Sequence, residues 1–126
     1  MGTGYKGNSI SYRRISENLS MLKSEYNYDK GYFFEQGKGR DYTRNSYSAD
    51  PLKMAIDFYD KISYGGLEQD LKNGKGQYTK MADGTIITFR KTSSSDGSPA
   101  IDINISYSND TGGIKKQKIH FGKEKK

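Results

Sequence analysis

The stretch that decides the fold is AIDINISY, residues 100–107, together with QKIHF, residues 117–121, near the end of the chain. Apolar and polar residues alternate in both, which is the period of a β-strand with one buried face and one open face. The only histidine, His120, falls on the polar side of the second stretch. We therefore expect two strands, with the His120 side chain directed away from the core.

An earlier stretch, TIITFRK at residues 85–91, alternates in the same way. A strand at residues 77–81 should precede it, because the intervening Asp83 and Gly84 form a preferred dipeptide of tight hairpins. These four segments predict an antiparallel sheet. Its polar face would gather Arg90, Asn104, Lys118 and His120. Side chains of these types suit a site that handles phosphate.

Helices are expected before the sheet. Asp50 followed by Pro51 is a strong helix start, because Asp accepts a capping hydrogen bond and Pro suits the first turn. An apolar stripe follows at helical spacing, and the helix should run over residues 51–63 and stop at Gly65 and Gly66. The stripe consists of Leu52, Ala55, Ile56 and Tyr59, widened by Phe58 and Ile62.

A weaker stripe of Ile15, Leu19 and Leu22 predicts a short helix over residues 12–24. The expected fold is therefore α+β, with N-terminal helices packed on one face of a four-stranded antiparallel sheet and the other face open.

The composition indicates one domain with a modest core. Of the 126 residues 32% are hydrophobic, and the isoleucines and phenylalanines are concentrated after Ala49. The absence of cysteine excludes a disulfide framework, a thiolate metal site and a cysteine nucleophile, and a single histidine nearly excludes a histidine-based zinc site. Because no apolar run approaches the ~18 residues of a membrane span, we expect no membrane insertion by this domain.

The charge favours a polyanionic partner. The net charge is +6, and eleven tyrosines accompany 21 lysines and arginines. Cations contact phosphates and tyrosine rings stack on bases, so nucleic acid is the favoured polyanion.

The first part of the chain differs in character. Residues 1–49 are rich in Gly, Ser, Asn and Tyr, and we interpret them as a linker, a delivery segment or an N-terminal helical segment before a core at residues 50–126. Within them, residues 31–45 are predicted to form a loop or linker. Their glycine-rich basic part, Gly37–Arg40, could also touch phosphate, but it lacks the Lys-Ser/Thr end of a phosphate-binding loop.

Two segments resemble a known family. DGTIITFRKTSSSDGSPAIDINI at residues 83–105 and KKQKIHF at residues 115–121 are similar to the C-terminal toxin domains of bacterial polymorphic toxins, such as contact-dependent inhibition effectors and LXG-type toxins. The resemblance extends over about residues 40–121. It implies a metal-independent RNase, often acting on tRNA, with a fold of the barnase, EndoU, colicin E5/D and RelE type. EndoU nucleases use two histidines and this chain has one, so we do not assign it to that branch.

The resemblance also implies partners and a location. The domain would be the tip of a larger secreted or surface-delivered toxin that acts in the cytoplasm of the target cell. Its expected partners are RNA, in particular tRNA, and a cognate acidic immunity protein that binds and blocks the active site. A host protein of the translation apparatus is a further partner to consider.

Metal-free RNA cleavage needs a base for the 2′-hydroxyl, groups that offset the phosphorane charge and an acid for the 5′-oxygen. His120 is expected to carry protons because histidine titrates near neutral pH, and Arg90 is expected to clamp phosphate with its planar fork. Asp102 would orient the imidazole or hold Arg90. The candidate catalytic residues are His120, Arg90, Asp102 and Ser94; the candidate RNA-binding residues are Lys118, Thr88, Ser95 and Asn104. No metal or cofactor is expected.

Other interpretations stay open. Arg90 and Asp102 could form a simple cross-strand ion pair, and the serine loop could be a mere linker. Tyrosines such as Tyr42, Tyr47 and Tyr78 could pack, stack or donate a proton. A metal-dependent DNase would need clustered carboxylates, for which the sequence offers little beyond Asp102 and Asp96. The third possibility is a non-enzymatic RNA-binding module that uses the same basic face.

Overall fold

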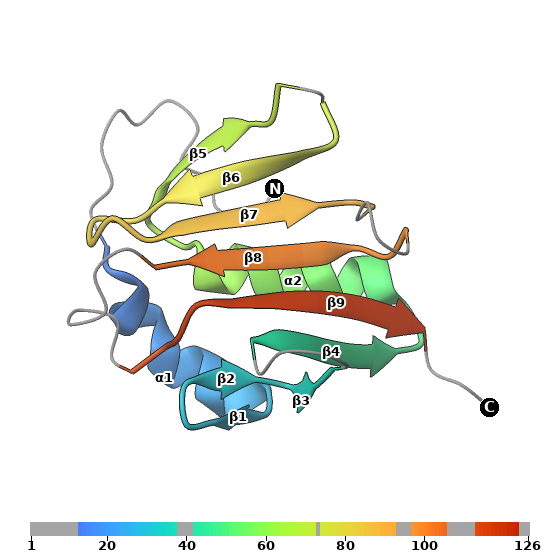
Figure 1. Ribbon diagram of the computed structural model, residues 1–126. Coiled ribbons are helices and arrows are strands. Elements are labelled where there is room, and N and C mark those ends of the chain that lie inside the picture. The colour runs from blue at the N-terminus through green and yellow to red at the C-terminus, as the bar shows by residue number, and fades with distance from the viewer. Residues whose placement is uncertain (1–12, 38–41, 73, 93–96, 106–112, 124–126) are drawn as a thin grey trace.

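The computed structural model describes residues 13–37, 42–72, 74–92, 97–105 and 113–123, which form two helices and nine strands. The helices are α1 (Ile15–Glu25) and α2 (Pro51–Ile62). The strands are β1 (Tyr28–Asp29), β2 (Tyr32–Phe33), β3 (Glu35–Gln36), β4 (Thr43–Ser48), β5 (Leu67–Asp70), β6 (Gly76–Lys80), β7 (Ile86–Arg90), β8 (Ala100–Asn104) and β9 (Gln117–Lys123). In Figure 1 the large sheet stands in front of α2, and α1 lies beside the lower end of the sheet. The α+β prediction is confirmed.

The large sheet has seven strands in the order β3-β4-β9-β8-β7-β6-β5. The four predicted strands are its central antiparallel run, β6 to β9. The prediction of a four-stranded antiparallel sheet is nevertheless wrong, because β5 extends one side while β4 and β3 extend the other. The sheet is also mixed, since β4 pairs with β9 in parallel.

Strand β4 explains why the sequence predicts too few strands for the sheet. Its inward residues, Arg44 and Ser46, are polar but only 8% and 5% exposed. Hydropathy therefore does not mark β4 as a half-buried strand, and its parallel partner β9 lies far away in the sequence.

The prediction of a loop or linker over residues 31–45 is wrong for the described residues, which contain β2, β3 and the start of β4. Two buried polar side chains hold this segment. Arg44 donates to the carbonyl oxygens of Phe33 and Phe34 at 3.0 and 2.8 Å. Gln117 accepts from the Phe33 amide at 2.8 Å and donates to the Gly31 carbonyl at 2.9 Å. The described residues before Ala49 are thus part of this fold, and a role in delivery stays a prediction.

Helix α2 begins as predicted. The Asp50 side chain accepts from the Lys53 amide at 3.2 Å, with Pro51 in the first turn. Its buried face comprises Ala55, Phe58, Tyr59 and Ile62. Leu52, expected in the apolar stripe, is 41% exposed instead.

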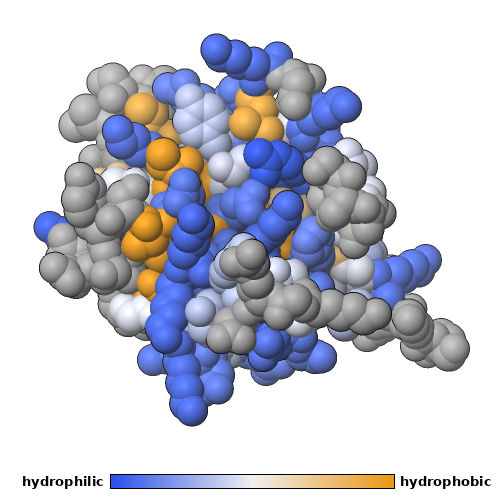
Figure 2. All heavy atoms as spheres, viewed as in Figure 1, coloured by the Kyte–Doolittle hydropathy of each residue, from blue (hydrophilic) through white to orange (hydrophobic). Residues whose placement is uncertain are grey.

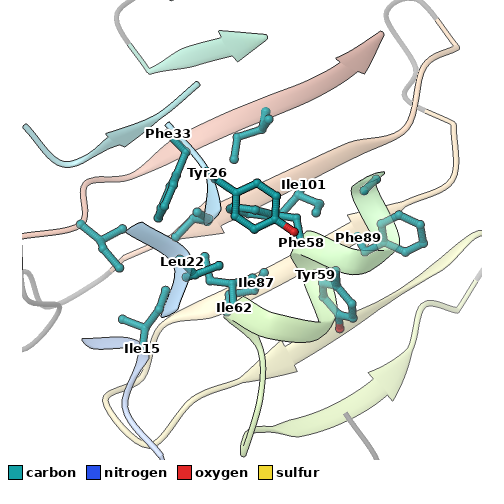
Figure 3. Packing of buried hydrophobic residues seen from close by; sticks show 14 of the residues in the cluster. Ile15, Leu22, Tyr26, Phe33, Phe58, Tyr59, Ile62, Ile87, Phe89 and Ile101 are labelled. Carbon is teal, nitrogen blue, oxygen red and sulfur yellow. The ribbon is translucent and has the colours of Figure 1, made fainter. Parts of the chain in front are cut away.

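The core lies between the helices and the inner face of the sheet (Figure 3). Most of its members follow Ala49, as predicted; residues from the first part of the chain complete it. Ile15 and Leu22 of α1 lie close to Ile62 of α2 in this view. The first-part members are Ile15, Leu19, Leu22, Tyr26 and Phe33. Within the described ranges, neither helix is long and apolar enough to cross a membrane.

Candidate functional site

The face of the sheet opposite the helices carries six of the eight candidate residues. In β7, β8 and β9 the outward positions alternate with buried Ile or Phe, as the period of two predicts. The six residues are Thr88, Arg90, Asp102, Asn104, Lys118 and His120. Figure 2 shows this face, which is largely hydrophilic with an apolar patch toward the left. Ser94 and Ser95, with Asp96, lie outside the described residues.

Strand register places His120 in a row across this face. His120 pairs with Ala100 of β8, and Ala100 pairs with Arg90 of β7. On the other side His120 pairs with Asn45 of β4. Because neighbouring strands lie about 4.8 Å apart, the backbones of Arg90 and His120 are about 10 Å apart with only the methyl group of Ala100 between them.

A second row runs beside the first. Thr88 pairs with Asp102, Asp102 with Lys118, and Lys118 with Thr43 of β4. The ion pairs found among the described residues do not include Lys118. This ammonium, two residues from His120 on the same side of β9, therefore remains available to an anion.

Arg90 and Asp102 form the cross-strand ion pair that the sequence left open. The Arg90 Nη1 lies 2.6 Å from the Asp102 Oδ2, and the two side chains are 41% and 31% exposed. At this exposure the pair contributes at most about 1 kcal/mol. Asp102 thus takes the second of its two expected roles and holds Arg90. The remaining guanidinium donors of Arg90 can still contact phosphate.

Asn104 does not join the group around His120. It pairs with Ile86, and it lies four residues along β8 from the Ala100 that borders His120, a separation of about 13 Å. The expectation that Asn104 gathers with Arg90, Lys118 and His120 is therefore too broad, because sharing a face does not mean sharing a row.

His120 lines a hollow of about 580 Å³ at the β3–β4–β9 side of the sheet, which combines polar side chains with the Tyr47 ring and two glycines. The Ser98 hydroxyl lies 3.5 Å from the His120 Nδ1, at the long limit of a hydrogen bond. The lining residues are Gln36, Gly37, Thr43, Asn45, Tyr47, Ser98, His120 and Gly122. This volume lies in the range of small-ligand sites.

The sequence interpretation missed the β4 part of this site. Thr43, Asn45 and Tyr47 face the hollow from a strand whose first half falls in the predicted loop. The available signal was the alternation of TRNSYS, in which Thr43, Asn45 and Tyr47 occupy one side. Tyr47, for which the sequence left packing, stacking and proton donation open, is 49% exposed.

Among the described residues, no group of three or more His, Asp or Glu side chains is arranged to hold a metal ion. Comparison with protein-family models, curated proteins and solved structures finds no match to this chain.

Proposed function

We propose that this chain is a ribonuclease toxin domain that cleaves RNA, with tRNA as the leading substrate, by attack of a 2′-hydroxyl on the adjacent phosphate. The observation that carries the proposal is the placement of His120. His120 lines the hollow of about 580 Å³, Lys118 lies on the same side of its strand, and Arg90 lies across Ala100. A proton carrier and two cations on one face suit phosphate transesterification.

In the proposed reaction His120 takes the proton of the 2′-hydroxyl. The 2′-oxygen forms a bond to phosphorus, the bond from phosphorus to the 5′-oxygen breaks, and a 2′,3′-cyclic phosphate remains. Lys118 gives a proton to the leaving 5′-oxygen, and Arg90 offsets the charge that develops on the phosphoryl oxygens. Such proton transfers contribute about 10² to 10⁴ in rate.

The wider setting is also proposed. The resemblance to polymorphic toxin tips and the net charge of +6 support delivery as part of a larger toxin and neutralisation by an acidic immunity protein. That partner would cover the face with Arg90, Lys118 and His120, and electrostatic steering would make its association rate fall as salt rises. A crosslinking map of the complex tests this: protection confined to α2, with His120 still open to solvent, contradicts occlusion.

Two competing functions use the same face. A metal-dependent DNase would use carboxylates as ligands, but Asp102 is bound to Arg90. A non-enzymatic RNA-binding module would use the same cations and tyrosines without turnover.

The test is incubation of the purified chain with total RNA, tRNA and plasmid DNA, each with EDTA and with magnesium. We expect RNA cleavage to persist in EDTA and to leave 2′,3′-cyclic phosphate ends. RNA carrying 2′-O-methyl groups should resist, because it lacks the nucleophile. DNA loss only with magnesium would favour the DNase, and RNA binding without cleavage would favour the binding module. Lys91→Gln serves as a control, because Lys91 is an exposed cation outside the two rows.

A further inference from the structure

The environment of Tyr47, which lines the same hollow as His120, suggests a further role. It lies on the open side of β4, and its partner in the parallel register is Gly122, two residues beyond His120 on β9. A Cβ atom added to Gly122 would lie 3.2 Å from both Cδ1 and Cε1 of the Tyr47 ring. The ring therefore lies against the backbone of Gly122. A side chain at position 122 would force the ring to shift.

Tyr47 lies against Gly122 without being buried. Its side chain is 49% exposed, the largest exposure among the exposed large hydrophobic residues described. Among the described aromatic and cation–π contacts, none involves Tyr47. Core packing therefore does not account for this exposed aromatic ring.

The surroundings of Tyr47 offer space and hydrogen-bonding groups for a ligand. Tyr47 and Asn45 line both the hollow of about 580 Å³ with His120 and a second hollow of about 230 Å³ on the side of Phe34 and Met54. Asn45 lies between Tyr47 and Thr43 on the same side of β4 and offers both an amide donor and a carbonyl acceptor.

We infer that Tyr47 is a stacking platform for an unpaired nucleobase of the substrate, placed so that the attached ribose and phosphate extend past Asn45 to His120. This inference rests on the proposed function and specifies its substrate as single-stranded RNA, such as a loop or an end. A paired base keeps its face inside the duplex stack, whereas an unpaired base can lie on an aromatic ring. Stacking accepts every base, so the platform positions the strand without dictating its sequence.

The test measures binding apart from cleavage. The probe is a short 2′-O-methyl RNA of mixed sequence, used alone and annealed to its complement, and the readouts are the dissociation constant and the NMR signals of the Tyr47 ring. The variants are Tyr47→Leu, which removes the aromatic ring, and Tyr47→Phe, which removes only the hydroxyl. Gly122→Ala displaces the ring. Tyr64→Leu is the matched control, because Tyr64 is 40% exposed and does not line the hollow.

We expect Tyr47→Leu to weaken single-strand binding about tenfold or more, Gly122→Ala to weaken it and shift the ring signals, and Tyr47→Phe and Tyr64→Leu to bind as the parent does. The duplex should bind more weakly than the single strand and leave the Tyr47 signals unmoved. The platform is overturned if Tyr47→Leu binds the single strand as tightly as the parent does, or if the single strand and the duplex shift the Tyr47 ring signals equally.

Cleavage of unmodified RNA separates this outcome from the proposed function. If the parent cleaves RNA but Tyr47→Leu binds normally, the platform is wrong and the ribonuclease stands. If Tyr47→Leu loses RNA binding while the parent never cleaves RNA, the platform is supported, the ribonuclease is wrong, and the chain is an RNA-binding module.

Discussion

The two faces of strand β9 differ: the inner face is buried in the core, and the outer face carries candidate site residues. On the inner face Gln117, Ile119 and Phe121 are 2%, 0% and 1% exposed, and they pack or hydrogen-bond within the core. On the outer face Lys118 and His120 are half-buried; His120 lines the hollow of about 580 Å³, and Lys118 lies in the second row beside Asp102. Substitutions on the inner face should therefore act on folding, and substitutions on the outer face should act on chemistry while leaving the fold intact.

The largest effect is expected from Phe121→Ala. The Phe121 ring is buried against Phe34 and Phe58, with centroids 5.7 and 6.1 Å apart, and its removal leaves a cavity. The free energy of unfolding should fall by about 3–5 kcal/mol in a denaturant titration. Lys118→Ala on the opposite face is the control and should change it by less than about 0.5 kcal/mol. Similar losses in both variants would remove the distinction between the faces.

A smaller loss is expected from Gln117→Ala, which tests the polar part of the inner face. The substitution leaves the buried Phe33 amide and the Gly31 carbonyl without the Gln117 partner. The free energy of unfolding should fall by about 1–3 kcal/mol, and hydrogen exchange at the Phe33 amide should accelerate. Gln69→Ala is the matched control, because Gln69 is exposed on β5. Unchanged exchange at Phe33 would show that Gln117 does not anchor the first part of the chain.

Alkaline pH should weaken the inner side selectively. Burial raises the pKa of Tyr59 well above its ordinary value of 10.0 and also raises that of Tyr26 and Tyr28, while the hydrogen bond to Glu25 raises the pKa of Lys61. Each group holds its proton more tightly in the folded state. Stability is therefore fully present below pH ~10 and is lost as pH rises above it, by about 1.4 kcal/mol per pH unit for the buried Tyr59 while it is ionised only in the unfolded chain, and by less for the three more exposed groups. Denaturant titrations at increasing pH measure the loss, and a flat profile across this window would contradict it.

On the outer face, Arg90→Lys should change stability by less than about 1 kcal/mol, because the ion pair with Asp102 is partly exposed. RNA cleavage should fall much more than RNA binding, since an ammonium cannot replace two-pronged contact with a phosphate. Cleavage rates and dissociation constants measured on the same RNA separate these effects. Cleavage at the parental rate would show that Arg90 supplies only surface charge.

The sequence predicts those strands whose inward residues are apolar. In β7 and β8, the buried residues Ile87, Phe89, Ile101 and Ile103 alternate with polar residues. Because burial follows hydropathy in these two strands, the sequence predicts both the strands and the outward direction of the polar side chains. In the same way, the Asp50 cap marked the start of α2.

Strands with polar inward residues escaped prediction. Strand β4 buries Arg44, and β5 buries Glu68, so neither shows an apolar face in the sequence. The hollow beside His120 depends on the parallel pairing of β4 with β9, which no local pattern encodes. The outward direction of His120 could thus be predicted from the pattern of its own strand. The positions of Asn45 and Tyr47 beside it depend on the order of the strands in the sheet.

The most direct test of the account compares His120→Ala with the parental chain in thermal melting and in cleavage of tRNA in EDTA. His120 projects from the outer face of β9, so removing its imidazole takes nothing from the core but removes the proposed proton carrier. We expect an unchanged melting temperature and a loss of cleavage of about 10² or more. A well-folded His120→Ala variant that cleaves tRNA at the parental rate would contradict the placement of the chemistry at His120.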